Sequence, residues 1–391
     1  MRRIDADHAA TTRPAPEVLE AMSPYLGDGW GNASSVHARG EAARDAVESA
    51  RLEVTRLLGA QPEEVVFTAS GSEANNLALQ GALAASAEPR RRRVLVSAVE
   101  HPSVLATARF LATRGWDVSE LPVLANGVVD LDALREALAD DVALVSVMAV
   151  NNETGVLQPV EDIGPFVKQA GALFHVDAVQ AAGKRPIAVD AWQADLASVA
   201  AHKIRGPLGA AALFVRRRVK LVPLVHGGRQ ERGRRAGTEN LAAIAGFGAA
   251  AALARTELAA GAYRRVEALG ERLLAELLMR VPDTRLNGDL NRRAGGIVNV
   301  CFAGVDGEAL LHELDRAGVS VSTGSACSSG EPGPSHVLLA MGSRPEDAHA
   351  SVRFSLGTDT LDDDITHIAE VTPPLVERLR ALAGRAIEKS A

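Results

Sequence analysis

Short apolar runs separated by helical stretches dominate the chain from residue 65 to residue 215, and this alternation limits the possible folds more than any other feature. Each run is bounded by turn signals and is too short for a buried helix, so it predicts a buried strand. The expected strands cover residues 65–69, 94–99, 118–123, 143–150, 172–176, 196–201 and 211–215. Strands that alternate with helices favour an α/β fold, in which helices flank both faces of a mainly parallel central sheet.

The pattern changes after Gly237. Residues 239–279 are rich in Ala, Leu and Glu and predict one long, almost continuous helix. The elements expected beyond it are strands at 296–302, 319–322 and 351–356 and helices at 307–317 and 361–388. A chain of 391 residues is long enough for two domains. We therefore expect a large domain over residues 16–255 and a smaller α+β domain formed by residues 1–15 with 256–391.

Composition and charge exclude several classes of protein. A net charge of −7 gives no electrostatic reason to bind nucleic acid or an anionic membrane surface. The first residues, MRRIDADHAATT, lack the apolar segment of a signal peptide, and no apolar run approaches the length of a membrane span. We therefore expect a cytoplasmic protein with no direct contact to nucleic acid or membrane. The two cysteines, Cys301 and Cys327, are too few for a disulfide scaffold.

An acidic and a basic side chain end two neighbouring strands of the expected sheet. Asp177 follows one apolar run, and Lys203 follows the next. Ligands of open parallel sheets bind beyond the carboxyl ends of the strands, so we expect both side chains to face one crevice. Pyridoxal 5'-phosphate (PLP) needs a lysine for its Schiff base and a carboxylate beside its pyridine nitrogen. The alternative is a surface lysine and a helix-capping aspartate.

Further polar residues follow other expected strands. Gly71 and Ser72 begin a helix, where backbone N–H groups can bind phosphate or where a serine is simply an N-cap. His101 could stack on an aromatic cofactor and move protons, or it could be structural. Gln180 could donate to the ring hydroxyl of the cofactor. Asn152 could bond the same hydroxyl or a substrate carboxylate, or it could belong to an asparagine-rich turn.

Three residues lie nearer the C-terminus. Thr238 precedes the long helix and offers a second phosphate donor or a plain helix cap. Arg353 is a cation in an apolar run, where it could grip an α-carboxylate or form an internal salt bridge. Cys327 lies in the Gly/Ser/Pro-rich segment 322–335, which is typical of an exposed loop and therefore of a reactive thiol. Cys301, by contrast, is expected to be an inert residue within a strand.

Motifs along nearly the whole chain resemble those of group I cysteine desulfurases, the nitrogen-fixation and housekeeping iron–sulfur-assembly type. These motifs, in order, are DHAATT, TASGSEANN, VEHPSV, VNNETG, HVDAVQ, AHKIRGPLG, HGGRQERGRRAGT, NGDL, SVSTGSACSS and SVRFSLG. The resemblance implies a fold-type I PLP enzyme of the class V aminotransferase family. It also implies an activity, the removal of sulfur from L-cysteine that yields L-alanine and a persulfide on Cys327.

The resemblance assigns a role to each candidate residue. Lys203 would form the Schiff base, Asp177 would pair with the pyridine nitrogen, and His101 would stack on the ring. The phosphate contacts would be Gly71, Ser72, His202 and Thr238, with Thr238 reaching across a homodimer interface. The other contacts would be Gln180 and Asn152 at the ring hydroxyl, Arg353 at the substrate carboxylate and Cys327 as the sulfur acceptor. A sulfur-acceptor protein, such as an iron–sulfur scaffold or a thiolation enzyme, would be the partner.

The sequence departs from the family pattern in three places. Ala200 and Ala201 stand where serine and glycine are common, which removes one phosphate hydroxyl. Ser72 replaces a threonine but keeps a hydroxyl. The chain stops soon after its last expected helix, which puts a standard scaffold partnership in doubt. The alternatives are a selenocysteine lyase, another fold-type I PLP enzyme such as an aminotransferase, or a non-catalytic sulfur carrier or regulatory partner that has kept the fold. Whether Cys327 also serves as a transient iron–sulfur ligand is left open.

Overall fold

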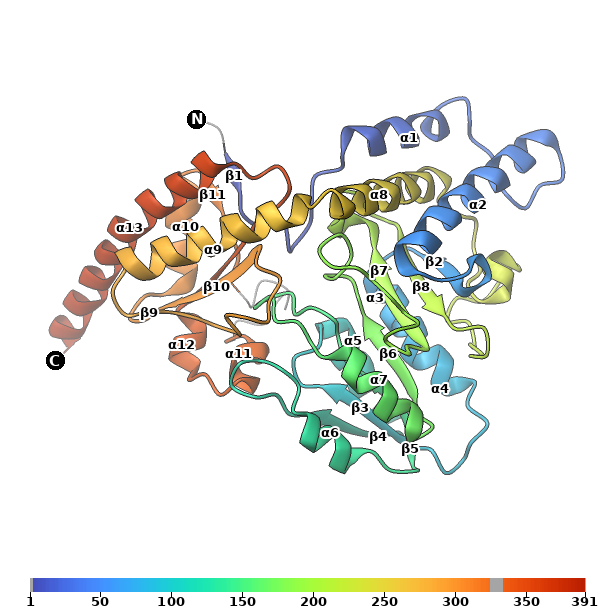
Figure 1. Cartoon of the computed structure of the whole chain (residues 1–391), viewed down its shortest axis with the longest axis horizontal. Helices are drawn as coiled ribbons and strands as arrows, with labels where there is room; N and C mark the ends of the chain where they lie inside the picture. The colour runs from blue at the N-terminus through green and yellow to red at the C-terminus, as the bar shows by residue number, and fades with distance from the viewer. Residues whose placement is uncertain (1–2, 324–332, 391) are drawn as a thin grey trace.

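The protein is described by a computed structural model that covers residues 3–323 and 333–390, with side chains described up to residue 384. Its two parts lie side by side, and α8 (Leu241–Ala259) and α9 (Ala262–Arg280) run along the top from one part to the other (Figure 1). The larger part is built on a seven-stranded sheet and the smaller part on a three-stranded sheet. The α/β class and the mainly parallel central sheet predicted from the sequence are both confirmed.

The large sheet has the strand order β2-β8-β7-β6-β5-β3-β4. The strands in that order are β2 (Val65–Thr68), β8 (Ala211–Val215), β7 (Leu196–Ala200), β6 (Leu173–Asp177), β5 (Val142–Ser146), β3 (Arg93–Ser97) and β4 (Asp117–Leu121). The neighbours from β7 to β4 pair in parallel, whereas β8 is antiparallel to both β2 and β7. A short connection from β7 to β8 suits an antiparallel pair, because a parallel pair needs a longer crossover.

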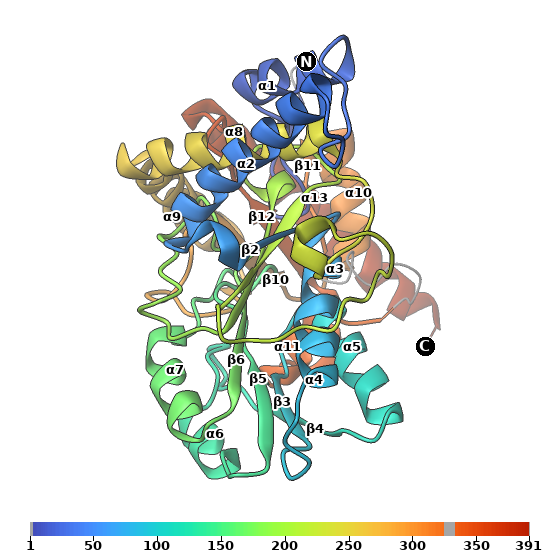
Figure 2. The ribbon, with the colours of Figure 1, turned by 90° about the vertical axis from the view of Figure 1, so that its right-hand side faces the viewer.

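Helices cover both faces of this sheet, and alternate residues of each strand pack against them. In β2, for example, Val65 and Phe67 belong to the cluster on one face and Val66 to the cluster on the other. Figure 2 shows α6 and α7 on one side of the sheet and α3, α4 and α5 on the other. The helices of this part are α1 (Pro16–Leu26), α2 (Ala38–Leu58), α3 (Gly71–Asn76), α4 (Ala82–Ala84), α5 (Pro102–Thr113), α6 (Leu131–Ala137) and α7 (Val160–Gln169). A π-helical segment, Leu77–Gly81, joins α3 to α4.

The small part has an antiparallel sheet of order β12-β10-β9. Its N-terminal strand β1 pairs in parallel with β11, so the first residues of the chain lie beside residues more than 300 positions later. The elements are β1 (Ile4–Asp5), β9 (Thr284–Leu286), β10 (Ile297–Phe302), β11 (Val319–Ser320), β12 (Ser351–Ser355), α10 (Gly307–Arg316), α11 (His336–Ala340), α12 (Pro345–His349) and α13 (Asp362–Ser390). α9, α10 and α13 lie on one side of the sheet, and α11 and α12 lie on the other (Figure 1).

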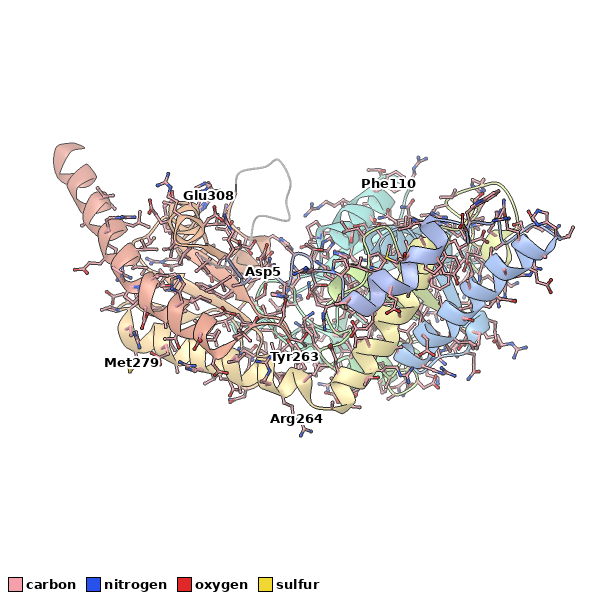
Figure 3. The ribbon with its side chains drawn as sticks, turned by 90° about the horizontal axis from the view of Figure 1, so that it is seen from above. Asp5, Phe110, Tyr263, Arg264, Met279 and Glu308 are labelled. Carbon is pink, nitrogen blue, oxygen red and sulfur yellow. The ribbon has the colours of Figure 1, made fainter. Side chains whose placement is uncertain are left out.

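The single helix expected over residues 239–279 is wrong in one respect, because Gly261 separates α8 from α9. Its φ of +76° is in the left-handed region, which glycine adopts at little cost. Tyr263 and Arg264 follow the break (Figure 3), where Tyr263 is buried and Arg264 is exposed. The break lets α8 pack in the large part and α9 in the small part.

α8 is the only described helix long and apolar enough to cross a membrane by its length and composition. However, 56% of its apolar window is buried, and the helix packs against α1 and α2. This burial is what a core helix of a globular protein shows.

Candidate active site

A cleft of about 280 Å³ lies at the carboxyl ends of β6 and β7, beside the first turn of α3. This position agrees with the rule that open α/β sheets bind ligands beyond the carboxyl ends of their strands. The cleft brings together eight residues that the sequence singled out, namely Gly71, Ser72, His101, Asn152, Asp177, Gln180, His202 and Lys203.

Asp177 is the last residue of β6 and is 4% exposed. Its Oδ2 accepts a hydrogen bond from Asn75 Nδ2 at 2.7 Å, and its Oδ1 accepts one from Val179 N at 3.0 Å. Each carboxyl oxygen therefore has its own donor. The buried side chain is held in one orientation at the wall of the cleft.

Lys203 ends the 3₁₀ turn Ala201–Lys203 that follows β7. Its Nζ donates to the carbonyl oxygens of Ala9 and Ala10, at 2.6 and 2.5 Å. These carbonyls belong to the N-terminal segment, almost 200 residues away in the sequence. The amine is therefore placed in the cleft by backbone acceptors from a distant segment.

The two histidines of the cleft are held neutral near pH 7. His101 caps α5, with its Nδ1 accepting from Ser103 N at 3.1 Å, and burial is the main cause of its lowered pKa. Burial, followed by the cation of Lys203, lowers the pKa of His202 to about 4. His202 Nδ1 lies 3.2 Å from Thr11 Oγ1. A neutral imidazole can stack on an aromatic ring or exchange a proton without adding a charge.

The residues of the cleft fit PLP. A β-carbon on Gly71 would lie 3.1 Å from Val179 Cγ2 and 3.6 Å from Ala200 Cβ, so glycine keeps the space at the start of α3 open. Backbone N–H groups in the first helical turn can bind a phosphate there. Asn75 also lines the cleft, and its Oδ1 is a buried atom without a hydrogen-bond partner among the described residues. Amine, carboxylate, imidazole and free backbone donors together match the groups that PLP presents.

Two predicted residues do not line this cleft, and a third is not described by the structure. Thr238 is exposed and lines a separate cavity with Gly237 and Asn240. Arg353 in β12 is 1% exposed, and it donates to the carbonyl oxygen of Asn152 at 2.9 Å and to Asp7 Oδ1 at 2.7 Å. The internal salt bridge considered from the sequence is thus present. Cys327 lies outside the described residues.

Cys301 has the environment expected of a packing residue. It is fully buried within β10, and burial raises the pKa of its thiol. A raised pKa suppresses the reactive thiolate.

Three contributors to the cleft were not predicted from the sequence, namely Asn75 and the carbonyl groups of Ala9 and Ala10. Asn75 carried a usable signal, because it lies four residues after Gly71 and such residues share one face of a helix. The two carbonyl groups carried no sequence signal, because every residue has a carbonyl group. Only the tertiary structure decides which carbonyl groups contact Lys203.

Comparison with known proteins supports the chemistry of the cleft. The aminotransferase class-V family model matches residues 5–368. A cysteine desulfurase of Trichormus azollae is 46% identical over 383 residues, which cover 98% of this chain and 95% of the relative. The cysteine desulfurase IscS of Dictyoglomus turgidum is 42% identical over 382 residues, which cover 98% and 96%.

A solved structure described as a NifS-like protein superposes with a TM-score of 0.90 at 34% identity, and the match covers 96% of this chain and 100% of that one. The family, the fold type, the cofactor and the activity predicted from the sequence are confirmed. The chain belongs to the class-V aminotransferase family and, within it, to the PLP-dependent cysteine desulfurases.

Proposed function

We propose that this protein removes the sulfur atom of L-cysteine in the cleft between Asp177 and Lys203 and transfers it to Cys327. The observation that carries the proposal is the meeting of a doubly hydrogen-bonded carboxylate and a lysine amine beside the open first turn of α3. These are the two groups that hold PLP and make it reactive.

Each residue has a distinct task. When bound, PLP supplies the electron sink that makes the Cα proton of an amino acid acidic. Asp177 would keep the ring nitrogen protonated, and Lys203 would hold the cofactor and, once released by the substrate amine, move the Cα proton. His101 would stack on the ring, and Gln180 and Asn152 would approach the ring hydroxyl. Gly71, Ser72 and His202 would contact the phosphate.

Arg353 and Asn152 would hold the substrate carboxylate. Arg353 is a buried cation next to the cleft, and its Nε has no hydrogen-bond partner among the described residues. Its hydrogen bond to the Asn152 carbonyl oxygen fixes the position of the guanidinium relative to Asn152. A planar guanidinium suits the bidentate binding of a carboxylate.

The sulfur transfer needs no added oxidant, because the carbon skeleton of the substrate takes up the electron pair. The Cys327 thiolate attacks the sulfur of the substrate, the new S–S bond forms, and the Cβ–S bond breaks. The electron pair and one proton pass to the carbon skeleton, which leaves as L-alanine. Cys327 keeps the sulfur as a persulfide, ready for a second thiol.

The destination of the sulfur and the assembly state are also proposals. A persulfide on a protein suits delivery to an acceptor protein for iron–sulfur cluster assembly or another thio-biosynthesis, and Cys327 could hold a cluster transiently. The exposure of Thr238, outside its own chain's cleft, supports a homodimer in which it reaches the partner's phosphate. A cytoplasmic location agrees with a reactive thiol, because that compartment is reducing.

The test is to measure alanine and sulfide released from L-cysteine in the presence of a reductant. We expect the wild type to release the two products one for one and Cys327→Ala to retain bound PLP but lose turnover. Cys301→Ala is the matched control, because it removes the buried thiol in β10 and should keep turnover. Equal turnover in Cys327→Ala and the wild type would refute the persulfide step.

A further inference from the structure

Lys184 is a buried lysine next to the cleft to which no role has yet been assigned. Its side chain is largely hidden from solvent, and its Nζ donates to Gln180 Oε1 at 3.1 Å. Within the described residues, no carboxylate forms an ion pair with it, and the charges that act on it are those of Lys203 and Arg353. Burial, and then these cations, lower the pKa of Lys184 to about 7. Burying a charged amine beside other cations costs free energy, so its position and its hydrogen bond are worth explaining.

A local turn aligns Lys184 with Gln180. Helix-like hydrogen bonds run from Ala182 N to Ala178 O and from Lys184 N to Ala181 O, at 3.1 and 3.0 Å. The turn includes Gly183 at a φ of +72°, and it places Lys184 Nζ 3.1 Å from Gln180 Oε1. The turn is therefore built so that the lysine amine reaches the amide of Gln180.

The two partners of Gln180 fix the direction of its amide group. Its Nε2 donates to the Ala9 carbonyl at 2.8 Å, and a carbonyl can only accept. Its Oε1 accepts from Lys184 Nζ, and an amide oxygen can only accept. A flipped amide would set its oxygen against the Ala9 carbonyl, which cannot donate.

The amide nitrogen is on the cleft side. Ala9 and Gln180 both line the cleft, whereas Lys184 lines a second, smaller cavity of about 50 Å³. Nε2 carries two hydrogens, and the bond to Ala9 uses one of them. The second hydrogen can donate to a ligand oxygen.

We propose that Lys184 is a positioning residue, which donates to Gln180 Oε1 and thereby keeps Nε2 available as a donor to the ring hydroxyl oxygen of PLP. This inference rests on the role proposed above for Gln180. Without Lys184, the amide can turn its carbonyl oxygen toward the cofactor oxygen. Two acceptors would then face each other, and one hydrogen bond would be lost.

The experiment is a double-mutant cycle on the full-length protein freed of PLP. The variants are Lys184→Met, Gln180→Met and the double substitution, and the readouts are the Kd for PLP and the visible absorbance of bound PLP across pH. Lys168→Met, which removes an exposed lysine of α7, is the matched control. Thermal unfolding without PLP checks that each variant folds, and Lys184→Met should fold because methionine suits a buried site. Lys184→Arg, which keeps a donor, is the second variant.

We expect Lys184→Met to weaken PLP binding about 3- to 10-fold, the net effect of one hydrogen bond, and to shift the pH titration of the absorbance band. Gln180→Met should do the same, and the double variant should be no worse than Gln180→Met, because coupled residues are not additive. Lys184→Arg should restore most of the affinity, and Lys168→Met should match the wild type.

Several results would overturn the inference. Some would reject only the role of Lys184, and others would also reject the proposed contact of Gln180 or the proposed function. Additive effects in the cycle, or an unchanged Kd and spectrum in Lys184→Met, would reject only the link from Lys184 to Gln180. An unchanged Gln180→Met would reject the proposed contact of Gln180 and the inference with it. Failure of the wild type to bind PLP would reject the function itself.

Discussion

Asn75 shows how strongly a single hydrogen bond can matter at the residue scale. Its amide is the donor to Asp177 Oδ2 and also reaches Ser103 Oγ at 2.9 Å, so it links α3 to the end of β6 and the start of α5. A hydrogen bond to a buried carboxylate is worth more than one between neutral groups. Asn75 is thus expected to hold the Asp177 charge in position for the cofactor nitrogen.

We predict that Asn75→Leu weakens PLP binding by roughly tenfold or more, because Asp177 loses a charge-assisted hydrogen bond. The measurement is the Kd of the PLP-free protein for PLP. Asn76→Ala is the control, since Asn76 bonds Ser72 O on the same helix but does not line the cleft. A Kd for Asn75→Leu equal to that of Asn76→Ala would contradict the prediction.

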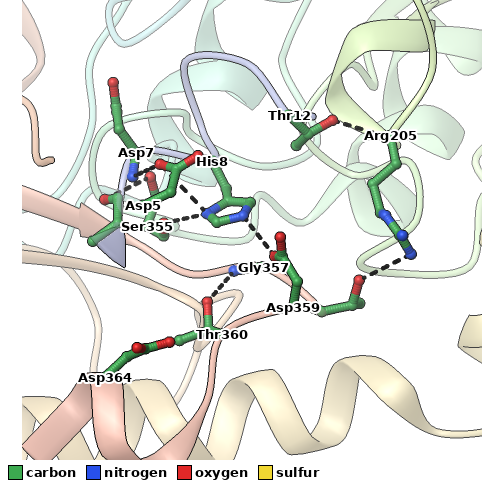
Figure 4. Close-up of polar contacts among 12 residues, drawn as sticks. Asp5, Asp7, His8, Thr12, Arg205, Ser355, Gly357, Asp359, Thr360 and Asp364 are labelled. Atoms are coloured by element: carbon green, nitrogen blue, oxygen red, sulfur yellow. Dashed lines mark hydrogen bonds and ion pairs between the residues drawn. The ribbon is translucent and has the colours of Figure 1, made fainter. Parts of the chain in front are cut away.

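At the scale of elements, the N-terminal segment after β1 connects the two parts of the molecule (Figure 4). Asp7 pairs with Arg353, and His8 Nε2 lies 2.9 Å from Asp359 Oδ1. A few residues later, Thr12 Oγ1 accepts from Arg205 N at 2.8 Å. The carbonyls that hold Lys203 lie between these anchors, so the anchoring of this segment bears directly on the cleft.

The pairing of His8 with Asp359 predicts a pH-dependent stability. The hydrogen bond to Asp359 is the largest of the effects that raise the pKa of His8, although burial opposes them, and the bond to His8 lowers the pKa of Asp359 to about 2. The nearby Asp5 raises the pKa of His8 further. The contribution of protonated His8 to the free energy of unfolding is complete below pH 6.5. It is lost as pH rises through the raised pKa of His8. The same ion pair also needs an ionised Asp359, so its contribution is lost as pH falls from 3.8 through about 2. The pair is therefore complete only between about pH 3.8 and 6.5.

We predict that Asp359→Asn lowers the free energy of unfolding at pH 5.5 by up to about 1 kcal/mol, a small value because Asp359 is partly exposed. At pH 9 the difference from the wild type should largely disappear, because His8 is then neutral. Denaturant unfolding at both pH values, with the same PLP content, is the measurement. Asp362→Asn, at an exposed ion pair with Arg272, is the control. A loss that is equal at both pH values would argue against this ion pair.

At the scale of the whole molecule, the segment that carries Thr238 is anchored from inside. Glu231 accepts two hydrogen bonds from Arg51, both at 2.8 Å, and a third from Phe67 N. A buried bidentate pair of this kind is costly to break. The segment is therefore held firmly in place, as the proposed contact of Thr238 with a second copy of the chain requires.

We predict that Thr238→Ala and Lys203→Ala complement each other when the two proteins are unfolded and refolded together. Each mixed dimer would combine an intact Lys203 from one chain with an intact Thr238 from the other. Since half of the dimers are mixed and each has one intact site, about a quarter of the wild-type sites should return. Turnover of L-cysteine is the measurement, and the separately refolded proteins are the control. Activity no higher than the sum of the two controls would place Thr238 outside the partner's site.

The fold class and the main chemical residues could be read from local sequence patterns. The period of the apolar residues reveals buried strands and helices. Asp177 ends β6 and Lys203 lies three residues after β7, which fixes their edge of the sheet. The antiparallel direction of β8 and the break at Gly261 were not predicted. An apolar run looks the same in either direction, and one glycine in an alanine-rich stretch interrupts a helix only if packing favours the break.

By itself, therefore, the sequence determined the α/β architecture, the family and the residues that bear reactive groups, because these depend on local periodicity and on side-chain chemistry. Only the tertiary structure decided that the carbonyls of Ala9 and Ala10 receive the amine of Lys203, that Asn75 supports Asp177, and that Lys184 is buried against Gln180. Most of these contacts join segments about 100 to 200 residues apart, and backbone acceptors carry no side-chain signal. Such contacts are set by how the sheet and the two parts of the chain pack, which no local pattern encodes.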